Sequence, residues 1–129
     1  MATSTATEST NLLGLRTVIY AAPNLDELKA WYTAILGFGP YFDEPFYVGF
    51  NVGGYELGLD PDAAFQAGST LTYWGVASIE AAYARIQSLG ATPAEPITDV
   101  GGGIKVATVK DPAGNVLGLI ENPHFSLAQ

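Results

Sequence analysis

The residue with the clearest chemical potential is Glu56, which lies in the largely apolar segment Tyr55–Leu59. In an extended strand alternate side chains point to opposite faces, so Glu56 and Gly58 share one face, opposite the two leucines. A carboxylate on a mostly apolar face could act as a general base or pair with a cationic ligand. It could also lie at the exposed rim of the strand without a chemical role. The sequence leaves both interpretations open.

Other side chains are candidates for contact with a ligand. Thr17 and Tyr73 could form hydrogen bonds with one, although a tyrosine on a half-buried strand more often packs its ring and leaves its hydroxyl in water. The run Gly101–Gly103 before Lys105 could hold an anionic group with its backbone amides, or could be a long hairpin loop. The candidate ligand-binding residues are Thr17, Tyr41, Phe50, Glu56, Gly58, Tyr73, Lys105 and Gly118. Glu56 is also the candidate catalytic residue.

The composition excludes several classes of function. The 129 residues include 13 acidic and 5 basic side chains, for a net charge of −8. Such a surface disfavours nucleic acids and anionic membranes, which bind positive patches. The chain has no cysteine, and therefore no disulfide, thiol nucleophile or thiolate metal site. No apolar run is long enough to span a membrane and no signal peptide is visible, so we expect a cytoplasmic protein.

The first half of the chain predicts one helix among four strands. Leu25, Leu28 and Tyr32 follow helical spacing, Asn24 is placed as the N-cap with Glu27 as in a capping box, and a glycine follows the last turn. The predicted elements are a strand at 12–20, a helix at 25–36, and strands at 40–43, 46–52 and 55–59.

The second half repeats this order. Ser78 is the expected N-cap of the second helix, and a glycine again follows its last turn. The turn Asp111–Asn115 combines Pro with Gly and leads into the last strand. The predicted elements are strands at 70–76, 94–98, 104–110 and 116–120 and a helix at 79–89. Trp31 and Trp74 are expected in the core that faces the helices.

The repeat predicts the organisation of the chain. Residues 1–11 are expected to form a disordered tail, because they are rich in Ser, Thr and Ala without apolar periodicity. One module spans residues 12–60 and a second spans 70–123, with a linker at 61–69 and a C-terminal tail at 124–129. Both modules contain a Leu-Gly-Leu strand, centred on Gly58 and on Gly118. The fold class is therefore α+β, with tandem βαβββ modules.

Specific segments resemble the vicinal oxygen chelate superfamily, which includes glyoxalase, bleomycin-resistance proteins and extradiol dioxygenases. The resemblance rests on 24–32 with 35–38, on 79–83 with 89–91, and on the Asp-Pro-Ala-Gly-Asn turn at 111–115. It implies a cup-shaped mixed sheet with helices on the convex side and a ligand or metal in the cup. Family cups are commonly completed by pairing modules, so the resemblance also implies a homodimer.

The resemblance also locates where a metal would bind. In metal-dependent members, four side chains, usually His and Glu, hold one divalent cation. Here those positions fall on Thr17, Leu71 or Thr72, Glu56 or Gly58, and Gly118. One carboxylate is too few for a catalytic metal, which usually takes about three protein ligands. We therefore expect no metal or other cofactor, and a Mg²⁺ or Mn²⁺ held mainly by water is the alternative.

Two functions remain. The first is a metal-free protein that binds a small, largely apolar molecule, aromatic or cationic, in a cup where Gly58 and Gly118 leave room for a bulky guest. The alternative is a lyase or isomerase related to glyoxalase that uses Glu56 as a base, with or without a divalent metal.

Overall fold

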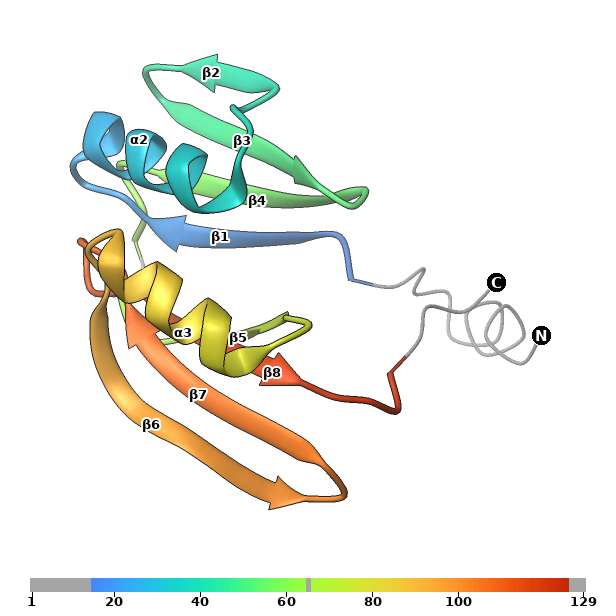
Figure 1. Ribbon diagram of the computed structural model, residues 1–129. Helices are drawn as coiled ribbons and strands as arrows, with labels where there is room; N and C mark the ends of the chain where they lie inside the picture. Colours follow the sequence, from blue (N-terminus) through green and yellow to red (C-terminus); the bar gives the residue numbers. More distant parts are fainter. Residues whose placement is uncertain (1–14, 65, 126–129) are drawn as a thin grey trace.

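A computed structural model describes residues 15–64 and 66–125 (Figure 1). The order strand, helix, three strands occurs twice, which confirms the predicted modules. The elements are β1 (Thr17–Ala21), α2 (Leu25–Leu36), β2 (Phe42–Glu44), β3 (Tyr47–Val52), β4 (Tyr55–Asp60), β5 (Leu71–Gly75), α3 (Ile79–Ser88), β6 (Thr92–Gly101), β7 (Ile104–Lys110) and β8 (Val116–Glu121). The tail predicted at 1–11 and residues 126–129 lie outside the described residues. No helix in the described ranges is long and apolar enough to cross a membrane.

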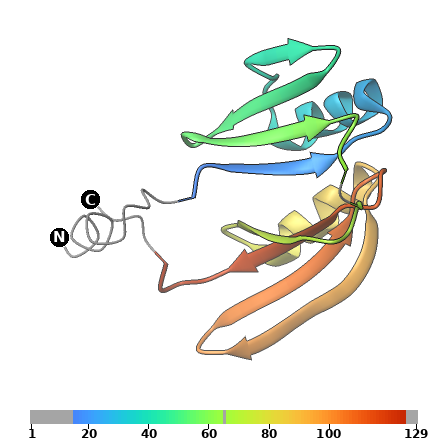
Figure 2. The same ribbon diagram turned by 180° about the vertical axis from the view of Figure 1, so that it is seen from behind.

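Each module forms one mixed sheet of four strands. The strand order is β1-β4-β3-β2 in the first sheet and β5-β8-β7-β6 in the second. The pairs β1–β4 and β5–β8 are parallel, and the other pairs are antiparallel. Figures 1 and 2 show both helices on the same side of the two sheets, which leaves the opposite face of each sheet without a helix. The fold class is thus the predicted α+β cup.

The helices form where apolar residues recur on one face. Helix α2 buries Leu28, Trp31 and Tyr32 against its sheet and ends at Gly37, whose φ of 86° is the left-handed conformation that glycine favours. The capping box expected at its start is not formed in the usual way. The Asn24 side-chain amide donates to Glu27 Oε1 at 2.9 Å instead of accepting from the helix backbone.

The largest departure from prediction is β6, which runs over ten residues where a short strand at 94–98 was expected. The strand contains Pro93 and Pro96, although proline cannot donate a hydrogen bond to a neighbouring strand. The strand tolerates them because it is the edge of its sheet and pairs only with β7. Register shifts along this pair absorb the irregular positions.

A buried polar network joins the two modules. Asp111, in the turn before β8, is 4% exposed. Its Oδ1 accepts the backbone N–H groups of Ala113 and Asn115 at 2.8 and 2.9 Å. Its Oδ2 accepts hydrogen bonds from Tyr32 Oη of α2 at 2.7 Å and from Asn115 Nδ2 at 2.8 Å. Asn115 Nδ2 also donates to Ala21 O, at the end of β1, at 2.8 Å. The turn recognised in the sequence therefore also forms a buried polar contact between the modules.

We expect the substitution Asp111→Asn to lower the free energy of unfolding by about 2 kcal/mol, because hydrogen bonds to a charged, buried acceptor are lost or weakened. Urea denaturation measures this. Asp99→Asn is the matched control, since Asp99 also accepts a backbone N–H two residues on, at 2.8 Å, but on an exposed hairpin. Equal effects of the two substitutions would contradict a special role for the buried carboxylate.

Candidate functional site

The helix-free face of the first module carries a carboxylate held by two phenols. Tyr41 Oη and Tyr47 Oη both donate to the Glu56 carboxylate, one to each oxygen. The three residues come from different segments: Tyr41 precedes β2, Tyr47 begins β3 and Glu56 lies on β4. The backbone N–H of Tyr41 bonds Gly49 O at 3.0 Å, which fixes this segment against β3. Glu56 therefore lies on this helix-free face, which we call the concave face. We call the cluster of Tyr41, Glu56 and Tyr47 the Tyr-Glu-Tyr site.

Glycines on this face make room for the site. A Cβ at Gly49 would lie 3.3 Å from the Glu56 carboxylate, and one at Gly58 would lie 2.0 Å from Tyr47 Oη. The space over Gly58 is thus filled by the phenol ring of Tyr47. The second module has the same arrangement, with a Cβ at Gly118 falling 2.6 Å from the ring of Tyr73. The expectation that these glycines leave room for a guest is therefore wrong, because tyrosine rings occupy that room.

Aromatic rings continue outward from the Tyr-Glu-Tyr site. The ring of Phe42 lies 6.5 Å from Tyr41, 6.0 Å from Phe46 and 6.1 Å from Tyr47, measured between centroids. Tyr41 is 64% exposed and Phe46 is 63% exposed. The carboxylate is therefore flanked by accessible ring faces. This combination attracts cations, both through the negative charge and through the ring quadrupoles.

The carboxylate also changes the acidity of its phenol partners. Burial first, and then the hydrogen bond and charge of Glu56, raise the pKa of Tyr47 far above its usual value of 10.0. The pKa of Tyr41 is raised chiefly by its hydrogen bond to Glu56. Both phenols therefore stay protonated through the neutral range and can keep donating to the carboxylate.

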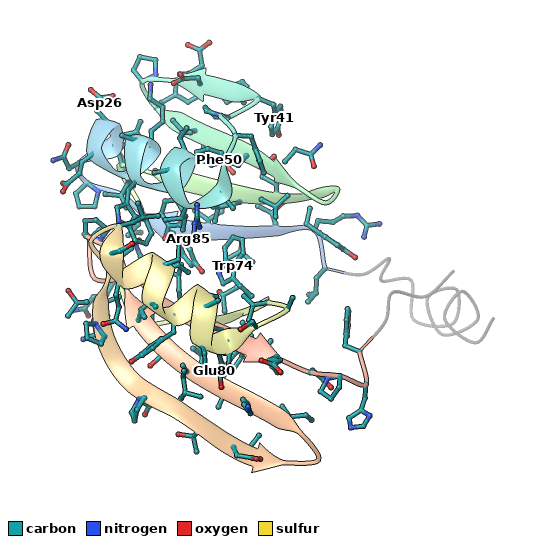
Figure 3. All side chains as sticks on the ribbon, viewed as in Figure 1. Asp26, Tyr41, Phe50, Trp74, Glu80 and Arg85 are labelled. Atoms are coloured by element: carbon teal, nitrogen blue, oxygen red, sulfur yellow. The ribbon has the colours of Figure 1, made fainter. Side chains whose placement is uncertain are left out.

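The structure brings some of the other predicted residues to this face and not others. Thr17 pairs in register with Glu56, and Tyr73 pairs with Gly118. Phe50, in contrast, is fully buried in the hydrophobic core, and Figure 3 shows it beside α2, whereas Tyr41 lies away from the helix. Its strand parity is that of Leu57, its partner in register, which packs in the core. Phe50 thus does not reach the concave face.

Lys105 also lies apart from the Tyr-Glu-Tyr site. Its Nζ forms an ion pair with Glu80 Oε2 at 3.2 Å, and Glu80 belongs to the first turn of α3 on the helix side. The preceding glycines form the β6–β7 hairpin, with φ values of 104°, 65° and 80°. The N–H of Gly101 is already bonded to Asp99 Oδ1 at 2.8 Å, so it is not free for an anion. The hairpin-loop interpretation of this run describes it better than the anion-binding one.

Two hollows open beside these residues. One, of about 290 Å³, lies between the modules and is lined by Glu56 and Tyr55 from the first module and by Tyr73 from the second. Another, of about 350 Å³, is lined by Tyr73, Ile120, Asn122 and Phe125. The sequence analysis named neither Tyr55 nor Phe125 as a lining residue, and it did not place Tyr47 beside Glu56. The parity of Tyr47 with Gly49 was the available signal for its place on the concave face.

The sequence and the fold were compared with known proteins. The Glyoxalase/Bleomycin resistance protein/Dioxygenase superfamily matches residues 14–119. The chain belongs to this superfamily. No curated protein matches the chain at a significant level.

Several solved structures share the fold at low sequence identity. A glyoxalase-related enzyme from Fulvimarina pelagi has a TM-score of 0.74 at 17% identity, over 89% of this chain and 92% of that one. Lactoylglutathione lyase from Agrobacterium tumefaciens has a TM-score of 0.72 at 19% identity, over 89% and 98%. TioX from Micromonospora sp. ML1 has a TM-score of 0.68 at 18% identity, over 84% and 98%. At these identities the likeness extends to the fold alone.

The residues at the expected metal positions do not fit a His and Glu ligand set. Across 15–64 and 66–125 no three His, Cys, Asp or Glu side chains are grouped as they would be to hold a metal ion. Thr72 lies on the strand face opposite to that of Tyr73, and its side chain bonds that of Tyr20. The sole histidine bonds Gly102 O at 2.8 Å through His124 Nε2, at the β6–β7 hairpin. Glu56 is thus the one carboxylate at these positions.

We expect the substitution Glu56→Gln to lower the pKa of both Tyr41 and Tyr47, because it removes the negative charge that disfavours phenolate. Tyr47 should stay above the usual tyrosine value because burial remains. Ultraviolet difference titration of the phenols measures this, with Glu44→Gln on the exposed strand β2 as the control.

The same shift has a consequence for stability. The pKa of Tyr47 is higher in the folded protein than in the unfolded chain. The protonated phenol therefore adds its full contribution to the free energy of unfolding below about pH 10, and this contribution is lost as the pH rises above that value. Denaturant titrations at alkaline pH should therefore show a shallower decline for Glu56→Gln than for the unsubstituted chain. An unchanged phenol titration in the variant would contradict the hydrogen bonds described.

Proposed function

We propose that this protein binds a small, largely apolar aromatic molecule with a cationic group, without a metal, on its concave face. The observation that carries the proposal is the Tyr-Glu-Tyr site, where a carboxylate stands among exposed aromatic rings. The cationic group would lie against Glu56, and the aromatic part would stack on Tyr41 or Phe46. A small aromatic guest would suit the hollow of about 290 Å³ beside Glu56.

Binding is favoured over catalysis by the hydrogen bonds of Glu56. A general base must present a free lone pair to the substrate proton. Each oxygen of Glu56 already accepts a phenol proton, which steadies the carboxylate and orients it as a fixed negative charge. The alternative function, a lyase or isomerase related to glyoxalase with Glu56 as the base, would use the lone pair that each oxygen keeps after it accepts one phenol proton.

We expect phenyltrimethylammonium to raise the thermal unfolding midpoint by mass action, and acetophenone, a neutral aromatic of similar size, to raise it less. Glu56→Gln should weaken binding of the cation about tenfold and leave acetophenone within about twofold, because only the cation uses the charge. Calorimetric titration measures both. Glu44→Gln is the matched control, since Glu44 is exposed on β2.

Two results would contradict this proposal. The first is equal weakening of both ligands by Glu56→Gln, which would mean that the site lost its shape and not its charge. The second is near-stoichiometric Zn, Ni, Fe or Mn in elemental analysis of the protein purified for the titrations, which would contradict a metal-free site. If a turnover assay is found, an unchanged rate in Glu56→Gln would exclude Glu56 as a base.

We also propose that the protein is a homodimer whose concave faces are covered by pairing modules. Tyr41, Phe46 and Tyr73 leave 64%, 63% and 46% of their surface exposed, and exposed apolar patches often mark contacts between proteins. Sedimentation equilibrium at micromolar concentration should give twice the mass of the chain, which is 13.5 kDa. A Phe46→Ser substitution should shift the protein toward monomer, and a purely monomeric unsubstituted protein would contradict the proposal.

A further inference from the structure

The junction between the modules contains a second cavity, on the helix side of the sheets. It measures about 190 Å³ and lies between α2 and α3. Leu36 from α2, Ile86 from α3 and Leu119 from β8 form its apolar walls, with Trp74 and Gly75 on β5. No acidic side chain lines it. A cavity of this size is comparable to engineered apolar cavities of about 150 Å³ that hold one benzene ring.

Two features of β5 define the floor of this junction cavity. The indole N–H of Trp74 donates to Tyr20 Oη at 3.2 Å, so the ring is held in place from the other module. A Cβ at Gly75 would meet no atom within 4 Å. Because Gly75 shares the strand face of Tyr73, that open space lies on the concave side, and Gly75 lines the junction cavity with its backbone.

The polar group at the cavity is Arg85. Its Nη1 and Nη2 donate to Ile35 O and Ala34 O at 3.0 and 3.1 Å, at the C-terminal end of α2 (Figure 3). Helix α2 has no basic residue in its own last turn. A helix end carries about half a negative charge, so the full charge of Arg85 is only partly offset there. The guanidinium also has five N–H donors, of which two are used here.

We propose that the junction cavity is a binding site for a small aromatic carboxylate. The ring would lie against Trp74 over Gly75, and the carboxylate would accept the free N–H groups of Arg85 at the rim. Across 15–64 and 66–125, the ion pairs are Lys29 with Asp43 and Lys105 with Glu80. Arg85 is in neither pair, so its positive charge can pair with the negative charge of a bound carboxylate. The site is separate from the Tyr-Glu-Tyr site, which lies on the concave face and suits a cation.

Benzoate and its neutral isostere benzamide are the probes. The chain has two tryptophans, so the NMR spectrum has two indole N–H signals, which single Trp→Phe variants assign. We expect benzoate to shift the Trp74 signal with saturation at roughly millimolar concentration, as befits a ligand of this size. The Trp31 signal should move little, because Trp31 does not line the cavity and its N–H is bonded to Leu89 O at 2.9 Å.

Substitutions separate the ring from the charge. Arg85→Gln should weaken benzoate about tenfold and benzamide less than about twofold, whereas Arg85→Lys should retain most of the benzoate affinity. Ala82→Leu should abolish the binding of both, because Ala82 of α3 lines the cavity and a leucine there would fill it. Lys110→Gln, on the exposed end of β7, is the charge-matched control and should change neither.

Several results would overturn the proposal. A Trp74 signal that does not saturate would show that benzoate is not bound at the junction. A shift of the tyrosine signals of the concave face in its place would show the same. Equal weakening of benzoate and benzamide by Arg85→Gln would show that Arg85 only holds the helices together. If Ala82→Leu does not fold, the comparison of Arg85→Gln with Arg85→Lys still decides the question.

Discussion

The arrangement of the two modules depends on one buried carboxylate, that of Asp111. A buried charge is costly unless it is fully hydrogen-bonded, and this one has four donors, from Ala113, from Tyr32 and twice from Asn115. Tyr32 belongs to the first module, so the carboxylate is satisfied only when the modules are docked. Asn115 completes the contact through Ala21 O. The polar network thus selects one relative position of the two sheets, and the hollow beside Glu56 and the junction cavity take their shapes from it.

Two faces of the same fold carry opposite chemistry. The concave face presents Glu56 among aromatic rings, held by Tyr41 and Tyr47. The helix side presents Arg85 at the rim of an apolar cavity. The chain has 13 acidic and 5 basic residues. This negative net charge does not show that one face presents a carboxylate and the other a guanidinium. Local partners decide which charge a ligand meets.

Much of the fold could be predicted from the sequence, because its signals are local. Helix α2 begins and ends where predicted, since apolar spacing and the left-handed Gly37 fix it within a few residues. Strand β6 could not be predicted at its full length, because only the sheet order shows that its prolines lie on an edge. The site was partly predictable. The face of Glu56 follows from strand parity, but its hydrogen bonds to Tyr41 and Tyr47 depend on how β2 and β3 fold back over β4.

The pairing of glycine with tyrosine in both modules restricts how this chain can diverge. At Gly58 and Gly118 the neighbouring rings of Tyr47 and Tyr73 already fill the volume that a side chain would need. A carboxylate could enter either position only if the tyrosine beside it became small, and the loss of the tyrosine alone would leave a gap over bare backbone. Each single change is thus unfavourable until its partner follows. Acquiring a metal-ligand set at these positions would take correlated substitutions on neighbouring strands, so the chain is separated from a metal-dependent descendant by a mutational barrier in each module.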